Sequence, residues 1–488
     1  LEKFWGVFQK MISEITRQVE RSWAETPLEL RAPYPEGGDE PFDYQHAGVE
    51  YALARPHAII GDEPGLGKTC QAILISNFLK SSRTLIVCPA SLRLNWVREI
   101  HKGSNLPTPI KIYPVLKSKD GTARGTSYLV VSYDLLRNKD LLKAILLEKW
   151  DHLILDEAHA LKDPAGNKRT RAICTPGGLA SQARRLTLLS GTLLPNQPVE
   201  VYNAMRLLDW SSIDNMSLAQ FREYYYDIGS GFLRVGGKVK YVNNLRNVPR
   251  HLAELGERLR GHLMVRRLAD DVLPQLPQAR WHLFPLIADT NVRKALKHPG
   301  WKTVAKLYEL DSDQFQRGIQ IDGEVATARR ELGEAKAPLV AAYVKELLDS
   351  GLKKIVVSAW HISVINILFK LLGPKYGTAV IHGGTIPAKK DKAVYAFQND
   401  EEVSIIIGQM KVIGEGWNLT AAQDVVNAEP DWVPGANEQL IRRIRRIGQK
   451  GNNLIGHLPV VPGSLEERIV ATAVKKDKVI HEVLDGRR

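Results

Sequence analysis

Residues 61–69 read Gly-Asp-Glu-Pro-Gly-Leu-Gly-Lys-Thr, and this stretch decides the fold. It follows an apolar run at 58–60 and precedes a helical pattern at 70–75. A strand, a glycine-rich loop and a helix in this order are typical of a phosphate-binding loop, because backbone N–H groups and the helix N-terminus attract phosphate oxygens. Lys68 can reach the β- and γ-phosphates of a nucleotide, and Thr69 can place its hydroxyl on Mg²⁺. The stretch therefore predicts a nucleotide site.

Length and charge limit the class of protein. A chain of 488 residues with 44% hydrophobic residues is too long for one ordinary core, so two or three domains are expected. Lysine and arginine exceed aspartate and glutamate by 67 to 54, which gives a net charge of +13. This excess favours a polyanionic partner, with nucleic acid as the first candidate. From charge alone, a basic soluble enzyme without such a partner explains the excess equally well.

Cysteine content and hydropathy indicate the compartment. The three cysteines lie in apolar segments and cannot form a disulfide framework, which favours a reducing compartment and no structural zinc. No apolar run approaches the ~18 residues that span a membrane, and no signal peptide opens the chain. Short termini favour a cytoplasmic protein of a bacterium or phage; in a eukaryote the nucleus is expected. The chain begins with Leu1 rather than methionine, which is consistent with a fragment.

Apolar runs place strands in two separate regions. Runs at 85–88, 129–131 and 153–155 fit buried parallel strands of an α/β sheet. This alternation is lost over 200–280, which reads as helical and aromatic-rich, and 281–335 is mixed and polar. It resumes near Lys336, and runs at 355–357, 379–381 and 405–407 predict a second sheet. A helix over 464–484 closes the chain.

An acidic strand end follows the run at 153–155. Asp156 stands where a carboxylate can hold Mg²⁺ through water, and Glu157 can orient or deprotonate an attacking water. Alone, Asp156-Glu157-Ala158-His159 is equally well a solvated strand end; downstream of a phosphate-binding loop the catalytic interpretation is favoured. Ser190-Gly191-Thr192 follows a further apolar run and reads most simply as a turn.

Residues 439–449 read Gln-Leu-Ile-Arg-Arg-Ile-Arg-Arg-Ile-Gly-Gln. The apolar residues recur at about helical spacing and can anchor one face, which would hold the guanidinium groups in place. Planar, always-charged arginine suits a γ-phosphate whose charge spreads during transfer. A solvated basic helix or a nuclear-import patch remains the alternative for this stretch.

Together these motifs resemble the SWI/SNF-type helicase-like ATPases of helicase superfamily two, over 42–484. The strict phosphate-loop pattern has glycine at the position of Asp62, whereas that family has Asp-Glu-x-Gly-x-Gly-Lys-Thr, so Asp62 is a mark of the family. Tyr44-Gln45 resembles its adenine-recognising segment. Further matching segments are Cys88–Leu92 with Asn95-Trp96, Asp156–His159 with Leu161-Lys162, Ser190–Thr192 with Asn196, Pro198 and Glu200, Arg266-Arg267, His382–Gly384, Gly414–Thr420, Trp432 with Pro434, and Gln439–Gln449.

The resemblance implies an α/β fold of two tandem RecA-like lobes with helical insertions. The expected divisions are an N-terminal helical extension at 1–41, a first, ATP-binding lobe at 42–204, a helical insertion and inter-lobe segment at 205–280, a second insertion or linker at 281–335, a second lobe at 336–462 and a C-terminal brace helix at 463–488.

The resemblance also assigns site residues. Lys68, Glu157, Arg443 and Arg446 are expected to be catalytic, with both arginines contributed by the second lobe. Thr69 and Asp156 are expected to hold Mg²⁺. The residues expected to bind ATP are Tyr44, Gln45, Asp62, Gly65, Gly67, Lys68, Thr69 and Gly416, and those expected to contact DNA are Ser91, Asn95, Trp96, Gly383 and Thr420.

The implied activity is that of a DNA-stimulated ATPase that translocates on double-stranded DNA and remodels protein–DNA complexes or branched DNA. It is expected to act as a monomer, alone or recruited by a partner protein or by an accessory domain that this sequence lacks. The Ala428-Glu429…Trp432-x-Pro434-Gly435 segment looks most like the annealing-helicase branch. The alternatives are a strand-separating helicase, the motor of a restriction-like system, for which no nuclease motif is found, and a non-catalytic DNA-binding module, which the intact motif residues disfavour.

Two departures from the family pattern stand out. Leu193 replaces the proline that usually follows Ser-Gly-Thr. Ile441, Arg442 and Arg445 replace the usual acidic pair and histidine, and we expect this extra charge to alter DNA affinity or coupling.

Overall fold

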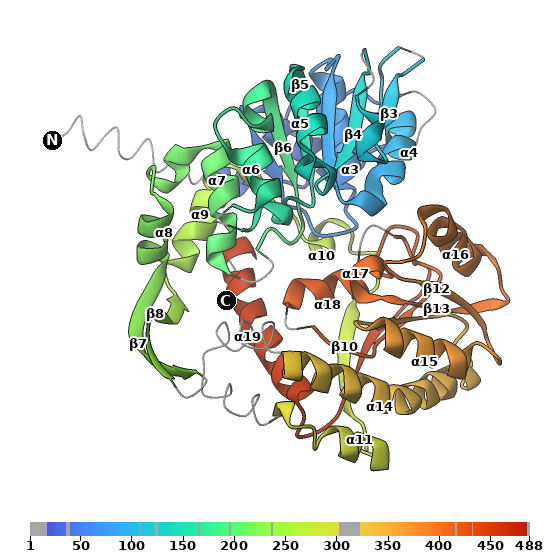
Figure 1. Cartoon of the computed structure of the whole chain (residues 1–488). Coiled ribbons are helices and arrows are strands. Elements are labelled where there is room, and N and C mark those ends of the chain that lie inside the picture. The colour runs from blue at the N-terminus through green and yellow to red at the C-terminus, as the bar shows by residue number, and fades with distance from the viewer. Residues whose placement is uncertain are drawn as a thin grey trace. The chain divides into compact units, whose positions relative to one another are not determined.

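The computed structural model describes residues 17–35, 40–107, 109–122, 125–163, 166–194, 197–235, 238–301, 323–414, 417–431 and 433–485 (Figure 1). The chain divides into two compact units. The first unit comprises residues 1–225, 249–274 and 479–488, and the second comprises 226–248 and 275–478. Each unit is built on its own sheet, which confirms the prediction of two α/β lobes.

The first unit contains a seven-stranded parallel sheet in the order β3-β4-β2-β5-β6-β1-β9. The predicted apolar runs lie in β2, β4 and β5, where nearly every residue is buried, as expected for strands covered on both faces. The strands are β1 (Ala58–Ile60), β2 (Thr84–Cys88), β3 (Ile112–Pro114), β4 (Tyr128–Ser132), β5 (Trp150–Asp156), β6 (Ala183–Leu189) and β9 (Met264–Val265).

Helices cover this sheet and connect its strands. Residues of α2, α3 and α4 contribute to a continuous apolar core that includes Val49, Ile73 and Trp96. The α-helices of the first unit are α2 (Asp43–Leu53), α3 (Lys68–Phe78), α4 (Arg93–Gly103), α5 (Lys139–Leu146), α6 (Lys168–Cys174), α7 (Tyr202–Leu208), α8 (Leu218–Tyr225), α9 (Leu252–His262) and α10 (Ala269–Val272).

The second unit contains a six-stranded parallel sheet in the order β10-β15-β14-β11-β13-β12. Separate apolar clusters, one containing Val357 and Leu368 and the other Ile406 and Phe397, pack on it. The strands are β10 (Ala279–Pro285), β11 (Ile355–Ala359), β12 (Gly377–Ile381), β13 (Val403–Gln409), β14 (Asp424–Asn427) and β15 (Leu454–Val460). The helices are α11 (Thr290–Ala295), α14 (Gly323–Asp349), α15 (Ile362–Leu372), α16 (Pro387–Asn399), α17 (Met410–Ile413), α18 (Pro434–Ile441) and α19 (Leu465–Asp485).

The segment at 205–280 differs from its helical prediction. It does contain α8 and α9, but Tyr226–Val235 (β7) and Lys238–Pro249 (β8) pair as a two-stranded sheet. It also supplies β9 to the first sheet, and β10 joins the second sheet. The predicted linker at 281–335 therefore shares a strand with the second sheet; its residues 302–322 lie outside the described part of the chain.

The predicted closing helix is α19. The boundary between the two units falls inside it, between Lys478 and Val479, so its last turn belongs to the first unit. None of the helices in the described ranges has the length and apolar character required to cross a bilayer.

Candidate functional site

The predicted phosphate-binding loop connects β1 to α3, and its glycines make the turn. Gly65 and Gly67 have φ of 96° and 73°, in the left-handed region that favours glycine. A Cβ on Gly67 would also collide with the Nε2 atom of Gln45. The helix α3 begins at Lys68, whose ammonium group donates hydrogen bonds to the carbonyl oxygens of Asp62 (2.8 Å) and Glu63 (3.1 Å). The loop thus folds back over the lysine at a helix N-terminus.

Tyr44 and Gln45, the predicted adenine segment, support this loop from α2. The Tyr44 hydroxyl and the Gln45 Nε2 atom each donate to the carbonyl oxygen of Leu66, at 3.2 Å. The Gln45 Oε1 atom accepts from the backbone N–H of Phe42 at 3.0 Å. The structure therefore brings together α2 and the phosphate loop, while the contact of Tyr44 and Gln45 with adenine stays a prediction.

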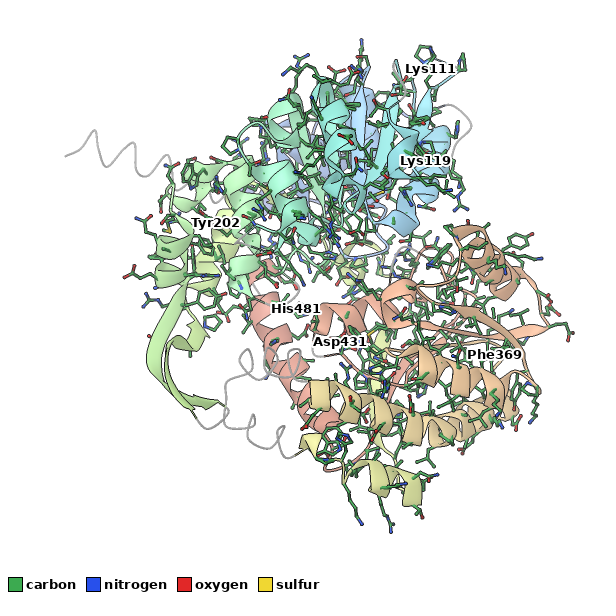
Figure 2. The ribbon with its side chains drawn as sticks, in the orientation of Figure 1. Lys111, Lys119, Tyr202, Phe369, Asp431 and His481 are labelled. Carbon is green, nitrogen blue, oxygen red and sulfur yellow. The ribbon has the colours of Figure 1, made fainter. Side chains whose placement is uncertain are left out.

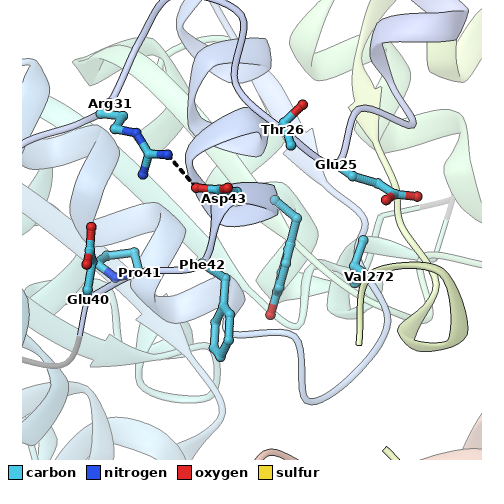
Figure 3. Close-up of a pocket in the computed structure, with 9 residues that line it drawn as sticks. Glu25, Thr26, Arg31, Glu40, Pro41, Phe42, Asp43 and Val272 are labelled. Atoms are coloured by element: carbon cyan, nitrogen blue, oxygen red, sulfur yellow. Dashed lines mark hydrogen bonds and ion pairs between the residues drawn. The ribbon is translucent and has the colours of Figure 1, made fainter. Parts of the chain in front are cut away.

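A pocket of about 600 Å³ opens beside α2 (Figure 3). The rings of Phe42 and Tyr44 stack with centroids 5.6 Å apart and planes 18° apart, and Phe42 is partly exposed. The exposed ring of Phe42 offers a flat face on which a planar base could stack, and most of the other lining residues are polar or charged. The lining residues are Glu25, Thr26, Arg31, Glu40, Pro41, Phe42, Asp43, Tyr44 and Val272.

Asp62, the residue that replaces glycine in the loop, is fully buried and faces an arginine. Its carboxylate accepts from Arg267 Nε (2.8 Å) and Nη2, from the Arg267 backbone N–H (3.0 Å) and from Gln71 Nε2 (2.8 Å). The predicted contact of Asp62 with nucleotide stays a prediction. In the structure, the Asp62 side chain connects the loop to the segment that follows β9.

The loop entrance is joined to that same segment by backbone hydrogen bonds. Gly61 N–H donates to the carbonyl of Val265 (2.7 Å), and Glu63 N–H donates to that of Arg267 (3.1 Å). The Glu63 carboxylate accepts from the backbone N–H of Ala269 at 2.7 Å. Sequence reasoning identified Arg266-Arg267 only as a family signature, and no local signal predicts that these residues support the loop.

Asp156 lies at the carboxyl end of β5 and is held in two directions. Its Oδ2 atom accepts from the indole N–H of Trp96 (2.8 Å), and its Oδ1 atom accepts from the Glu157 backbone N–H (2.9 Å). Burial, and then the charge of Glu157, raise the pKa of Asp156 to about 6, although the bond from Trp96 acts in the opposite direction. A nearby cation such as Mg²⁺ would stabilise the ionised form of this carboxyl group.

Glu157 adopts a left-handed backbone conformation, with φ of 51°. Such a conformation is uncommon for a residue other than glycine and is often found at functional sites. The Glu157 carboxylate pairs with His159 Nδ1 at 3.2 Å, and the Ser190 hydroxyl lies 3.5 Å from the same nitrogen. The structure therefore connects Asp156–His159 with the predicted Ser190-Gly191-Thr192 turn.

The donor set fits a magnesium ion that arrives with phosphates. Mg²⁺ prefers oxygen ligands and is commonly held by one or two carboxylates together with substrate phosphates. The Thr69 hydroxyl in the first turn of α3 and the Asp156 carboxylate are donors of this kind. Within the described ranges, no group of three or more His, Cys, Asp or Glu side chains is arranged to hold a metal ion by itself.

The predicted DNA contacts of the first unit fall into two kinds. Ser91, in the short helix η1 (Ala90–Leu92), and Asn95, in α4, are partly exposed. Trp96 is only 1% exposed and donates to Asp156. The burial of Trp96 argues against contact with DNA, which stays an untested prediction, and indicates a role in holding Asp156.

The predicted DNA contacts of the second unit follow its strands. Gly383, after β12, is exposed, and its N–H donates to Gln409 Oε1 at 3.1 Å. The Thr420 hydroxyl accepts from Gln398 Nε2 at 3.2 Å. Among the other predicted motif residues, Gly416, Asn196 and Trp432 lie outside the described residues.

The two predicted catalytic arginines differ in their surroundings. The helix α18 ends at Ile441, so the arginines lie in the turns after it and not on one long helix. Arg443 is 2% exposed, donates to the carbonyl of Gly414 (2.5 Å) and accepts at its own carbonyl from Leu419 N–H (2.9 Å). Arg446 is partly exposed and donates to Asn418.

The two additional arginines make contacts within the second unit. Arg445 is buried and donates to the carbonyl of Pro277 at 2.9 Å. Arg442 pairs with Glu438 at 3.3 Å. Their predicted effect on DNA affinity or coupling stays a prediction, and part of their charge is directed into the unit itself.

Comparisons with known proteins identify the family to which this chain is similar. Residues 44–324 match the SNF2-related domain, and residues 340–448 match the helicase conserved C-terminal domain. Among curated relatives, the DNA annealing helicase and endonuclease ZRANB3 of Mus musculus is 29% identical over 451 residues, covering 91% of this chain and 41% of the relative. The SWI/SNF-related matrix-associated actin-dependent regulator of chromatin subfamily A-like protein 1 of Drosophila melanogaster is 30% identical over 428 residues, covering 85% and 52%.

Among solved structures, the Sulfolobus solfataricus SWI2/SNF2 ATPase core in complex with dsDNA has 18% identity and a TM-score of 0.43, covering 94% of this chain and 96% of that one. The chain spans about half or less of the length of the two curated relatives. Its match to the SNF2-related domain extends over more than half of its own residues, which confirms the predicted resemblance. This chain therefore belongs to the SNF2-related family and carries a helicase conserved C-terminal domain.

Proposed function

We propose that this protein is a DNA-dependent ATPase that translocates on double-stranded DNA and remodels branched DNA or protein–DNA complexes. Family membership supports an ATP hydrolase of the helicase-like translocase type. The observation that carries the proposal is the joint placement of a phosphate loop closed over Lys68 and of Asp156 and Glu157 at the end of β5. Phosphate loops of this kind serve phosphoryl transfer when a carboxylate lies beside them.

The residues of the first unit have distinct roles in this proposal. Backbone N–H groups of the loop and the Lys68 ammonium group bind the phosphates. Thr69 and Asp156 would hold Mg²⁺, which supplies charge neutralisation on the phosphate oxygens. Glu157 orients the attacking water and accepts its proton. The aromatic surface of Phe42 and Tyr44 is proposed to receive the adenine base.

Arg443 and Arg446 are proposed to complete catalysis from the second unit. Arginine suits the spreading charge of the transferred phosphoryl group, and Arg446 is the more exposed of the two. Arg443, which is hydrogen-bonded to Gly414 and Leu419, is the better candidate for holding these two residues in place. Supplying catalytic groups from both units would make hydrolysis depend on their relative movement, which is how DNA contacts could be shifted.

DNA is proposed to be held by its phosphates, at Ser91, Asn95, Gly383 and Thr420. Contacts to phosphates carry no sequence information, so binding should not depend on sequence. Branched DNA is the proposed substrate because the name of one relative describes a DNA annealing helicase and because Glu429 belongs to the segment that resembles that branch. We also propose that the protein acts as a monomer.

A phosphate-release assay with and without DNA tests the proposal. DNA should increase hydrolysis, and removal of Mg²⁺ with a chelator should abolish it. Lys68→Ala should weaken nucleotide binding, whereas Arg446→Ala should abolish DNA-stimulated hydrolysis with nucleotide affinity nearly intact. Full activity of the Arg446→Ala protein would contradict the assignment.

Substrate and strand separation are tested by two further assays. Displacement of a triplex-forming strand reports translocation on duplex DNA without unwinding. A labelled fork reports whether strands are separated or annealed. Separation of the strands of a linear duplex would favour a strand-separating helicase over the proposed remodelling activity.

A further inference from the structure

Arg266 connects three parts of the first unit that are far apart in the sequence. Its Nη1 atom donates to the carbonyl oxygens of Gly61 (2.7 Å), at the entrance of the phosphate loop, and of Gly191 (3.1 Å), in the turn after β6. Its Nε atom donates to the Asp485 carboxylate at 2.5 Å. Asp485 is the last residue of α19, so this arginine joins the end of the chain's final helix to the loop.

The last turn of α19 is embedded in the first unit. Val483, Leu484 and Asp485 are all buried, and a Cβ on Gly256 of α9 would collide with the carbonyl of Val483. The second oxygen of Asp485 accepts from His481, which is labelled in Figure 2. Burial alone would raise the pKa of Asp485, but Arg266 and His481 outweigh burial and hold that pKa below its usual range. Asp485 is therefore ionised at neutral pH.

The two carbonyls that Arg266 binds belong to segments in close contact. A Cβ on Gly191 would lie 2.6 Å from Cδ of Pro64 and 2.9 Å from the carbonyl oxygen of Asp62. The turn at Gly191 thus backs directly onto the loop. A displacement of Arg266 would shift both the phosphate loop and the turn at Gly191, because these two closely packed segments have no room to adjust independently.

The other end of α19 is fixed by a second buried ion pair, inside the second unit. Glu466 pairs with Lys336, which is fully buried and also donates to the carbonyl of Pro459 at 3.1 Å. The Glu466 carboxylate also accepts from the backbone N–H of Val461 at 3.3 Å. Each pair holds its own end of the helix in place, because breaking a buried pair leaves an uncompensated charge.

We propose that the last turn of α19, acting through Asp485 and Arg266, positions the phosphate loop, so that nucleotide affinity depends on the docking of this turn. The proposal deepens the proposed function and rests on it for the identity of the nucleotide. Asp485 and Arg266 are positioning residues, since Asp485 acts through Arg266 and Arg266 binds backbone carbonyl groups of the loop entrance and the adjacent turn. Any event that pulls this turn from its site would weaken nucleotide binding, which makes the turn a point of control.

The test measures binding of a fluorescent ATP analogue with Mg²⁺ and without DNA. Asp485→Asn should weaken binding about fivefold, as for a residue coupled to a site through one buried network. Hydrogen exchange of peptides covering residues 61–69 should become faster. Exchange of peptides from the strands of the first sheet should stay unchanged. These readouts separate a positioning role from a general loss of stability.

Two variants serve as controls. Glu466→Gln breaks the matching pair at the other end of α19, in the unit without the phosphate loop, and should lower the melting temperature with nucleotide affinity unchanged. Glu482→Gln removes one negative charge from the same turn of α19 and should change neither quantity.

Wild-type affinity and wild-type exchange in a folded Asp485→Asn protein would overturn the proposal. If that variant does not fold, His481→Ala decides, because it removes one bond to Asp485 without leaving Arg266 unpaired; it should show the same effects to a smaller degree, and unchanged affinity would overturn the proposal. The proposed function fails separately, if DNA does not stimulate hydrolysis by the wild-type protein.

Discussion

At the scale of one residue, Trp96 makes a contact that the sequence did not predict. Its indole N–H binds Asp156 at 2.8 Å and opposes the raised pKa of that carboxyl group. Trp96→Phe keeps an aromatic ring but removes this bond, so the pKa of Asp156 should rise above about 6. A larger protonated fraction at neutral pH means weaker metal binding. We therefore expect ATP hydrolysis to require several-fold more Mg²⁺, as measured by titrating Mg²⁺ at saturating DNA.

Asn95→Ala is the matched control on the same helix. Asn95 is partly exposed and is a proposed DNA contact, so its loss should lower DNA affinity and leave the Mg²⁺ requirement unchanged. The reverse pattern, in which Trp96→Phe impairs DNA binding alone, would restore Trp96 as a DNA contact.

The buried pair of Asp62 and Arg267 provides a second test at this scale. Both side chains are almost completely buried, and Asp62→Asn would leave the guanidinium charge uncompensated, at a cost of about 3–5 kcal/mol. Adding Arg267→Gln removes that charge, so the double variant should be more stable than the sum of the single effects predicts. Melting temperatures of the four proteins measure this coupling. Additive losses would show that the pair does not act as a unit.

At the scale of elements, His152 ties β5 to two neighbours. Its ring nitrogens lie 2.8 Å from the hydroxyl oxygens of Ser76 in α3 and Thr187 in β6. Burial, and then the charge of Arg185, lower the pKa of His152 from 6.5 to about 3. Between pH 6.5 and about 3, His152 is therefore protonated in the unfolded chain but not in the folded chain. Because the unfolded chain binds more protons, stability falls as the pH falls below 6.5.

We expect this histidine to cost the first unit about 2 kcal/mol of stability at pH 5 relative to neutral pH. His152→Gln removes the titrating group and should flatten the decline by about that amount. Calorimetric melting of both proteins at the two pH values measures the difference. An equal decline in both would show that other groups, such as His57, dominate the acid sensitivity.

The same elements show what the sequence could predict about the fold. Strands β2, β4 and β5 were predicted because strands covered on both faces are apolar throughout. The two-residue strand β9 is too short to leave a pattern, and the pair β7–β8 was wrongly assigned to a helical segment because its neighbours α8 and α9 are helical.

The site divides in the same way between local and distant contacts. The loop around Lys68 could be predicted because its turn and helix are set by adjacent residues. The partner of Asp62 could not, because Arg267 lies 205 positions further along the chain. The link from Arg266 to Asp485, over 219 positions, left no sequence signal either.

At the scale of the whole molecule, the net charge of +13 makes a prediction about DNA that does not depend on any one residue. If DNA is held through its phosphates, binding releases counterions and the logarithm of affinity falls linearly with the logarithm of salt concentration. With about six phosphate contacts, affinity should fall roughly a thousandfold between about 50 and 200 mM salt. Fluorescence anisotropy with two duplexes of unrelated sequence measures both the slope and the sequence dependence. Parallel, steep lines for the two duplexes support phosphate contacts, whereas a shallow slope with unequal affinities would indicate recognition of bases and contradict a protein that translocates along DNA regardless of its sequence.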